Sequence, residues 1–337
     1  PMLAVVLVGG FGTRLRPLTL TKPKQMLPVG SVTMLERVVD KLAAAGVTQV
    51  VLSLGYQPDA FIEEFPDGTC AGVGMHYAVE PEPLDTAGAI RFAAAHAGIT
   101  ERFFAINGDV LTDLDLAGLW KAHDSFGGQA TLALTPVEDP SRYGVVPIDQ
   151  DGRVEAFIEK PAAGTAPSNW INAGTYVLEP AVLDLIPAGS RVSIERETFP
   201  AIVADRALFG MHSDAYWIDA GTPEAYLQAH LDLIDGVRGE PEPSQSPLAT
   251  VHADAVVTRS VLGPGVNVEA GAHVVDSVVM RNSRVGAGAQ ISRSILGGGS
   301  SVGEASRLSD LTIVGFSQAV AAGTESVGER FPSAENW

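Results

Sequence analysis

The sequence predicts an α/β fold, namely a Rossmann-like, mostly parallel sheet with helices on both faces, followed by a short left-handed parallel β-helix. Two patterns support this prediction. Apolar strands alternate with helical segments up to about residue 235, which is typical of βαβ units. Beyond residue 249, apolar residues recur every six positions inside a longer repeat of 17 or 18 residues. Such a repeat is typical of a β-helix with three faces per coil.

Apolar runs and helical periodicity predict the strands and helices of the α/β part. Continuous apolar runs predict buried strands over residues 4–8, 50–54 and 103–106. The first run has no basic segment before it and leads into glycines, so we expect a strand rather than a signal peptide. Helical spacing of apolar residues predicts helices over residues 34–45 and 85–95. Ligands of such sheets bind at the carboxyl ends of the strands.

We expect an α/β domain over residues 1–235, a linker over 236–249, a β-helix over 250–314 and a short, partly ordered tail over 315–337. The linker is predicted from its proline, glycine and serine content. A loose β-sandwich is the alternative for the repeat region. The inward-facing residues expected for about four coils are Val256, Leu262, Val268, Val274, Met280, Val285, Ile291, Leu296, Val302, Leu308 and Val314.

Composition limits the class of function. The 337 residues carry a formal net charge of −18, which argues against a nucleic acid partner. No apolar run is long enough to span a membrane, so we expect no membrane partner. The single cysteine, Cys70, excludes a disulfide framework and a cysteine-based zinc site, and a cytoplasmic enzyme is expected. Basic residues gather at Arg14, Arg16, Lys22 and Lys24, which indicates a small phosphorylated ligand.

A glycine loop follows the first predicted strand. Its glycines are Gly9, Gly10 and Gly12. Glycines let the backbone turn sharply and bring N–H groups close to phosphate oxygens. The loop is not a Walker A sequence, and Leu15 occupies the third glycine position of a dinucleotide fingerprint. Its distinguishing elements are Arg14 and Lys24, two cations that can reach a polyphosphate.

The run from Val6 to Thr19, with residues 22–29 after it, resembles the sugar-1-phosphate nucleotidyltransferase family, and among its members those that use GTP and mannose 1-phosphate. The resemblance implies that the glycine loop and Thr13 hold the triphosphate, while Arg14 and Lys24 stabilise charge at the reacting phosphorus. It also implies in-line attack, with release of pyrophosphate. Two alternatives stay open: UTP, dTTP or ATP with glucose 1-phosphate, or a regulatory relative that binds nucleotide sugars without turnover.

Two carboxylates are candidate magnesium ligands. Asp109 follows a predicted strand and a glycine, and Asp219 lies in a Trp-Ile-Asp-Ala-Gly segment. Nucleotidyl transfer needs a divalent cation at the α-phosphate, and Mg²⁺ prefers one or two carboxylates together with phosphates and water. The pair also matches the metal-binding aspartates that the resemblance implies. We expect Asp109 and Asp219 to hold Mg²⁺ jointly.

The sugar phosphate is expected to contact segments similar to those of the family. The resemblance assigns the hexose to Gly144, through its backbone N–H, and to Glu159 and Asn172. It assigns the 1-phosphate to Lys160. Without it, a Glu-Lys pair would be interpreted as a solvated surface pair.

The base is expected at Glu80 and at a nearby loop, whose residues Thr86, Ala87 and Gly88 are also assigned to nucleotide binding. Guanine presents two adjacent donors, which one carboxylate can accept, so Glu80 favours guanine, although Glu82 could serve instead. Asp85 departs from the family pattern, which usually has glycine there, and it could perturb the pocket.

The β-helix has two interpretations. Similar segments carry acyl transfer in bifunctional relatives, but neither His252 nor His273 lies in a sequence that resembles such a site. We therefore interpret it as a packing or oligomerisation domain and expect a homo-oligomer.

Overall fold

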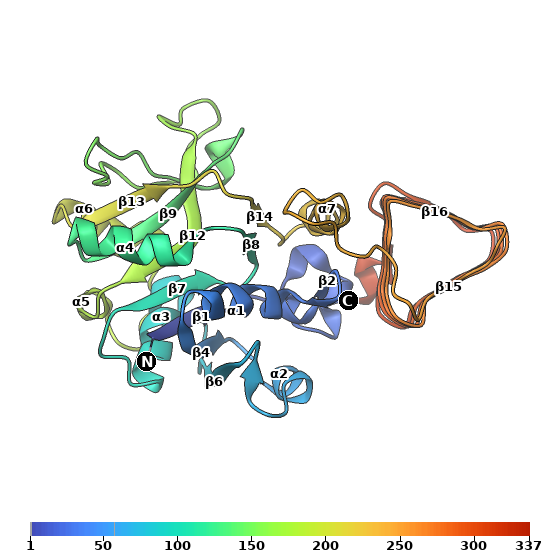
Figure 1. Cartoon of the computed structure of the whole chain (residues 1–337), viewed down its shortest axis with the longest axis horizontal. Helices are drawn as coiled ribbons and strands as arrows, with labels where there is room; N and C mark the ends of the chain where they lie inside the picture. Colours follow the sequence, from blue (N-terminus) through green and yellow to red (C-terminus); the bar gives the residue numbers. More distant parts are fainter. Residues whose placement is uncertain (1, 57) are drawn as a thin grey trace. The chain divides into compact units, whose positions relative to one another are not determined.

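The computed structural model describes residues 2–56 and 58–337. The chain divides into two compact units (Figure 1). Unit 1 contains the chain up to Gly10 and Leu35–Trp217; unit 2 contains Phe11–Met34 and Ile218–Trp337. The segment after the glycine pair therefore belongs to the same compact unit as the β-helix. The predicted boundary at residue 235 does not coincide with this division, because the chain crosses between the units near residues 10, 34 and 217.

The sheet of unit 1 is parallel at its centre and has antiparallel pairs on both sides of it. The central strands, which pair in parallel, are β7 (Phe103–Asn107), β1 (Met2–Leu7), β4 (Val47–Leu54) and β6 (Val73–Val79). Strand β12 (Trp170–Leu178) pairs antiparallel with β7 and also with β9 (Ala130–Pro136). The remaining strands of this sheet are β5 (Thr69–Cys70), β10 (Gly144–Val145), β11 (Ile158–Glu159) and β13 (Leu208–His212), while β8 (Val110–Thr112) lies outside it.

Helices cover both faces of this sheet. The helices are α1 (Met34–Ala44), α2 (Asp59–Glu64), α3 (Asp85–His96), α4 (Leu116–Phe126), α5 (Ala181–Asp184) and α6 (Phe199–Ala204). Val5 of β1 shares a buried core with Ile90 of α3. Side chains alternate between the faces of a strand, and on β7 the ring of Phe104 contacts Trp120 of α4, with centroids 5.0 Å apart. Each predicted strand and helix of this part is present, with ends that shift by up to three residues, and the predicted fold class is confirmed.

Unit 2 begins with the short elements η1 (Thr13–Leu15), η2 (Leu18–Leu20), η3 (Lys24–Met26), β2 (Pro28–Val29) and β3 (Val32–Thr33). We call residues 11–34 the signature segment. Helix α7 (Pro223–Ile234) starts at Thr222, whose side chain accepts a hydrogen bond from the Ala225 N–H. The buried Tyr226 hydroxyl of α7 donates to the Pro28 carbonyl. The signature segment and α7 are thereby joined inside one unit.

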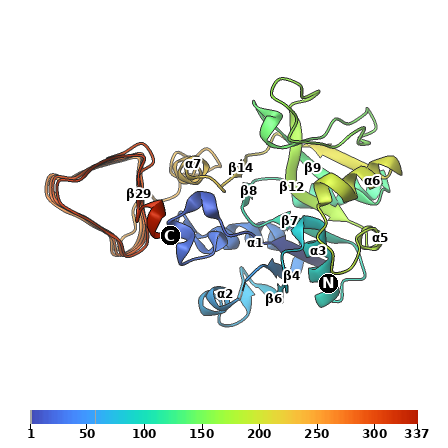
Figure 2. The ribbon, with the colours of Figure 1, turned by 180° about the vertical axis from the view of Figure 1, so that it is seen from behind.

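The β-helix consists of three parallel sheets, which form the sides of the triangular coil in Figure 2. Within residues 58–337 each of these sheets contains five strands. The first sheet comprises β15 (Thr250–Val251), β18 (Asn267–Val268), β21 (Arg284–Val285), β24 (Ser301–Val302) and β27 (Ala319–Val320). The second comprises β16 (Val256–Thr258), β19 (His273–Val275), β22 (Gln290–Ser292), β25 (Arg307–Ser309) and β28 (Glu325–Val327). The third comprises β17 (Val261–Leu262), β20 (Val278–Val279), β23 (Ile295–Leu296), β26 (Ile313–Val314) and β29 (Arg330–Phe331).

The β-helix is longer than the sequence predicted. Residues 315–331 form the fifth coil, because β27 pairs with β24 and β29 pairs with β26; the expected loose tail is thus mostly regular structure. Two inward assignments also change. Val256 is 45% exposed, while Val257 packs against the core. Val279 rather than Met280 belongs to the core cluster, although Met280 is buried. The other nine predicted inward residues lie in that core.

None of the helices within residues 2–56 and 58–337 is long and apolar enough to cross a membrane.

Candidate functional site

In unit 1, the first two glycines of the loop lie at the carboxyl edge of the central strands. The Val8 N–H donates to the Ser53 carbonyl of β4 at 3.1 Å, and the Gly108 N–H donates to the Leu7 carbonyl of β1 at 2.8 Å. Gly9 and Gly10 follow directly and are exposed. A Cβ added at either glycine would meet no heavy atom within 4 Å. The backbone here is therefore open to a ligand.

In unit 2, Gly12 lies where two parts of the signature segment pack closely against each other. Its φ is +58°, and a Cβ there would lie 2.9 Å from the Thr19 Cγ2 atom and 3.3 Å from the Lys24 Cβ atom. The Thr19 hydroxyl donates to the Gly12 carbonyl at 2.7 Å. The structure thus brings Gly12 and Lys24 together. Thr13 and Arg14 lie on η1 and are exposed.

The two candidate metal ligands lie one in each unit. Asp109 of unit 1 follows β7, in the turn that Gly108 bonds to β1, and it is half-buried. Asp219 of unit 2 ends β14 (Trp217–Asp219), and its Oδ1 atom accepts the Gly221 N–H at 3.0 Å. Both carboxylates are hard oxygen donors of the kind that Mg²⁺ prefers. No cluster of three or more metal-ligating side chains occurs in the described part of the chain, so a cation bound by either carboxylate would also need ligands from phosphates and water.

The predicted sugar residues Gly144 and Glu159 are directly paired across β10 and β11. A Cβ at Gly144 would lie 3.0 Å from a carboxylate oxygen of Glu159 and 2.8 Å from the Phe157 ring. Glycine is therefore required where the carboxylate folds over the strand. Lys160 follows in a left-handed conformation, with φ at +47°, and its ammonium lies 3.7 Å from Glu159. A strained conformation in a non-glycine residue is often associated with a functional site.

Glu195 is a further acidic residue that the sequence analysis missed. It lies on the π-helical turn η5 (Ile194–Thr198), and such turns are frequent at functional sites. Its carboxylate accepts hydrogen bonds from the hydroxyls of Thr86, at 2.8 Å, and Ser193, at 3.1 Å. Burial, followed by the charge of Glu195, raises the pKa of Glu159. Glu195 is therefore close enough to Glu159 for their charges to interact, and its carboxylate also binds Thr86. The alternating charges of residues 195–197 are typical of an exposed helix, so the sequence does not indicate a functional residue here.

Asn172 is held by its own strand. Its Oδ1 atom accepts the Gly174 N–H at 2.9 Å and its Nδ2 atom donates to the Tyr176 hydroxyl at 2.8 Å. The pairing of β12 with β9 shifts register here, between Asn172 and Tyr176. A Cβ at Gly174 would lie 2.6 Å from the Asn107 side chain, so this irregular stretch packs against the turn that leads to Asp109. The structure thus brings Asn172 close to the end of β7.

Glu80 follows β6 at the same edge of the sheet. Its two carboxylate oxygens accept from the Ser53 hydroxyl and the Leu84 N–H, both at 3.0 Å. A carboxylate has about four lone-pair sites, so acceptor capacity remains for a base. Glu82 is exposed. Glu80 is thus the more firmly oriented of the two predicted base-binding carboxylates.

Thr86, Ala87 and Gly88, which the sequence analysis placed in a loop, form the first turn of helix α3, and their backbone donors are used inside unit 1. The N–H groups of Ala87 and Gly88 both point to the Val192 carbonyl, at 2.9 and 3.3 Å, and both residues are buried. A Cβ at Gly88 would lie 2.6 Å from the Ser190 carbonyl oxygen, so this glycine is needed for packing. We therefore expect Ala87 and Gly88 to shape a pocket rather than to donate hydrogen bonds to a nucleotide. Asp85 has a φ of +60°, which explains why glycine suits this position.

The fold and the arrangement of these segments define a class of protein. The family model for nucleotidyl transferases matches residues 3–236, and the model for the GMPPB C-terminal domain matches residues 242–326. The chain therefore belongs to the nucleotidyl transferase family, as the sequence predicted. By family, its substrates are a nucleoside triphosphate and a sugar 1-phosphate, and family members generally use a divalent metal.

Individual proteins of known sequence or structure are also similar to this chain. The mannose-1-phosphate guanylyltransferase of Mycobacterium tuberculosis (strain ATCC 25618 / H37Rv) is 41% identical over 282 residues, which cover 79% of this chain and 78% of that protein. Mannose-1-phosphate guanylyltransferase 1 of Arabidopsis thaliana is 41% identical over 70% of this chain, but the match spans only 66% of that relative. A Bacillus anthracis protein, assigned as a glucose-1-phosphate thymidylyltransferase and solved with sucrose, superposes with a TM-score of 0.59 over 68% of this chain and 94% of its own, at 24% identity. This last likeness concerns the fold alone.

Proposed function

We propose that this protein transfers a guanylyl group from GTP to mannose 1-phosphate, forming GDP-mannose and pyrophosphate. The observation that carries the proposal is the glycine loop, in which Gly12 packs against Lys24 and is followed by Arg14 on η1. The likeness to mannose-1-phosphate guanylyltransferases over most of the chain supports the choice of substrates.

The reaction we infer is a direct in-line displacement. A phosphate oxygen of mannose 1-phosphate attacks the α-phosphorus of GTP, a new P–O bond forms, and the bond to pyrophosphate breaks. The sugar phosphate is already an anion, so no general base is required. Exposed Arg14 and half-buried Lys24 would neutralise charge on the triphosphate, while Gly9 and Gly10 would offer backbone N–H groups. Positioning and charge neutralisation then account for the rate enhancement.

We assign a Mg²⁺ ion to Asp109 and Asp219. The fit rests on donor chemistry, because both are half-buried carboxylates at the ends of strands. When bound, the ion would neutralise charge on the phosphate oxygens and help to orient them.

Specificity would come from unit 1. Glu80, oriented by Ser53 and Leu84, would accept the two adjacent donors of guanine. The carboxylates of Glu159 and Glu195 would accept hydrogen bonds from hexose hydroxyls, and the Asn172 amide could accept or donate one. The Lys160 ammonium, whose side chain is 60% exposed, would bind the 1-phosphate. A site that binds hydroxyls with buried polar groups rejects sugars that leave those groups unpaired.

A direct test incubates the purified chain with GTP, mannose 1-phosphate and MgCl₂ and identifies products by mass spectrometry. The proposal predicts GDP-mannose and pyrophosphate in equal amounts. Unchanged GTP, or release of GDP or GMP alone, would overturn it.

The acidic composition and the single buried cysteine, Cys70, support action in the cytoplasm. We also propose that copies of the chain associate into a homo-oligomer; analytical ultracentrifugation would test this, and a monomer at micromolar concentration would refute it.

A further inference from the structure

One outward face of the β-helix differs from the other two. On the first two sheets, the outward residues are exposed and mostly polar, as at Asn267, Arg284 and Gln290. On the third sheet, the first residues of the five strands stack in register: Val261, Val278, Ile295, Ile313 and Arg330. The four apolar members of this column are buried, so this face packs against the rest of unit 2. Arg330 occupies a rung where the column would otherwise continue with an aliphatic side chain.

The guanidinium of Arg330 donates hydrogen bonds to the backbone of the signature segment. Its Nη1 atom donates to the Arg16 carbonyl and, at 3.4 Å, to the Arg14 carbonyl. Burial lowers the pKa of Arg330, while the charge of Glu224, at the start of α7, raises it. Arg330 is half-buried, and the two N–H groups of its Nη1 atom can donate to two closely spaced carbonyl oxygens. The side chain therefore binds two neighbouring backbone groups of one segment rather than a single surface partner.

Two neighbouring contacts join the same coil to the same segment. A Cβ at Gly315 would lie 3.2 Å from the Pro17 Cβ atom, so glycine is needed where Pro17 packs. The Lys22 ammonium lies over the Phe316 ring, 5.3 Å from its centroid. All three contacts fall between Arg14 and Lys24, the two cations assigned to the triphosphate.

We propose that Arg330 is a positioning residue for nucleotidyl transfer, because by binding the carbonyls of Arg14 and Arg16 it fixes the backbone from which the Arg14 side chain reaches the triphosphate. The inference rests on the proposed function. Arg14 lies on the three-residue turn η1, which has few internal hydrogen bonds: Leu15 N–H to the Gly12 carbonyl at 3.0 Å, and Arg16 N–H to the Thr13 carbonyl at 3.3 Å. Such a short turn needs external support to hold an exposed cation in one place.

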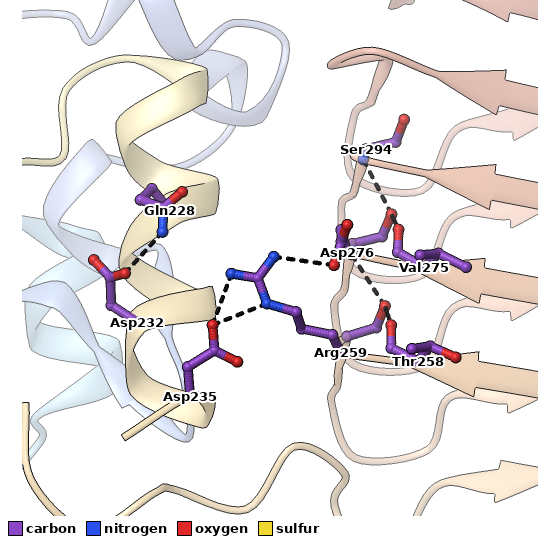
Figure 3. Close-up of polar contacts among 10 residues, drawn as sticks. Gln228, Asp232, Asp235, Thr258, Arg259, Val275, Asp276 and Ser294 are labelled. Carbon is purple, nitrogen blue, oxygen red and sulfur yellow. Dashed lines mark hydrogen bonds and ion pairs between the residues drawn. The ribbon is translucent and has the colours of Figure 1, made fainter. Parts of the chain in front are cut away.

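Arg259 supplies a matched control from the other end of the β-helix (Figure 3). Its guanidinium binds Asp235, at the end of α7, at 2.7 Å and Asp276, in the next coil, at 3.2 Å. Like Arg330, it joins the β-helix to another segment of unit 2. Unlike Arg330, it contacts no residue that we assign to substrate.

The experiment compares Arg330→Ile, which continues the apolar column, with Arg330→Lys and Arg259→Ala. We expect Arg330→Ile to lower kcat by roughly 10- to 100-fold, since small misplacements of catalytic groups have effects of this size. Arg330→Lys should recover part of the loss, and Arg259→Ala should keep kcat close to wild type. In an Arg14→Ala background, Arg330→Ile should add almost nothing, because residues that act through one another are non-additive. Losses that multiply in the double variant would overturn the proposal.

Amide hydrogen exchange of residues 12–27 measures the same contact without turnover. Faster exchange in Arg330→Ile than in wild type and Arg259→Ala is expected, with unchanged exchange in the β-helix core. Unchanged exchange together with unchanged kcat would refute the positioning role. If the wild-type chain forms no nucleotide sugar at all, the proposed function fails, while the exchange result still decides whether Arg330 orders the signature segment.

Discussion

Gly9→Ala separates the binding role of the glycine loop from its folding role. The added methyl group would meet no heavy atom within 4 Å, and Gly9 does not have the left-handed backbone that Gly10 adopts. The substitution should therefore leave the fold intact, and reduced freedom of the unfolded chain should stabilise it by about 0.4–1 kcal/mol. A phosphate that needs the backbone N–H groups at close range would meet the methyl group instead.

The expected loss of affinity follows from those N–H groups. A hydrogen bond to a charged group contributes about 1.5–3 kcal/mol, and about 1.4 kcal/mol corresponds to a tenfold change in affinity. Losing one such bond should raise the KM for GTP by roughly 10- to 100-fold.

Steady-state kinetics and thermal unfolding measure the two effects separately. Gly55→Ala is the matched control, because Gly55 follows β4 as Gly9 follows β1, and a Cβ there also meets open space. A wild-type KM for GTP in Gly9→Ala, or an equal loss in Gly55→Ala, would refute the assignment of the loop to phosphate.

Three other substitutions test the site. Asp109→Asn should lower kcat by at least about 100-fold with an unchanged melting temperature, whereas Asp113→Asn, next to Lys41 at 3.1 Å, should remain active; near-normal kcat in Asp109→Asn would exclude it as a metal ligand. Glu159→Gln should raise the KM for mannose 1-phosphate and stabilise the protein at pH 7. Burial and the charge of Glu195 raise the pKa of Glu159, so the stability that this carboxyl group contributes is present at low pH and lost as the pH rises through the raised pKa. The neutral glutamine does not undergo this loss. This gain in stability should disappear below about pH 4, where the carboxyl group is protonated in both the folded and the unfolded state. Urea unfolding at several pH values measures it, and a difference in unfolding free energy between variant and wild type that does not change with pH would contradict the raised pKa. Asp85→Gly should change the stability by about 1 kcal/mol at most, since aspartate tolerates the left-handed region, and should leave the KM for GTP nearly unchanged; a large fall in that KM would mean that Asp85 obstructs the base.

The sequence was informative where local chemistry decides the structure. The apolar run after Met2 forms β1 because its residues are buried on both faces of a parallel sheet. The six-residue period predicted the inward positions of the β-helix because each coil buries its apolar residues only against neighbouring coils. Gly12 was identifiable as a turn, and the structure adds the reason, which is its contact with Thr19 and Lys24.

Long-range packing could not be predicted in the same way. Arg330 lies more than 300 residues after Arg14 and Arg16, and nothing in its surrounding sequence indicates that its partners are two backbone carbonyls. Glu195 lies among alternating charges typical of an exposed helix, yet its carboxylate accepts from Thr86, 109 residues away. The Ala87 and Gly88 N–H groups looked available for a nucleotide because their acceptor, Val192, comes from a distant part of the chain.

The most direct test of the central claim is a competition among substrates. Wild-type protein would receive GTP, UTP, dTTP and ATP at equal concentration with mannose 1-phosphate, and in parallel with glucose 1-phosphate, and the ratio of products would give the ratio of kcat/KM values. The account predicts GDP-mannose as the dominant product. A dominant product with another base or with glucose would contradict the roles given to Glu80 and to the sugar-binding residues of unit 1.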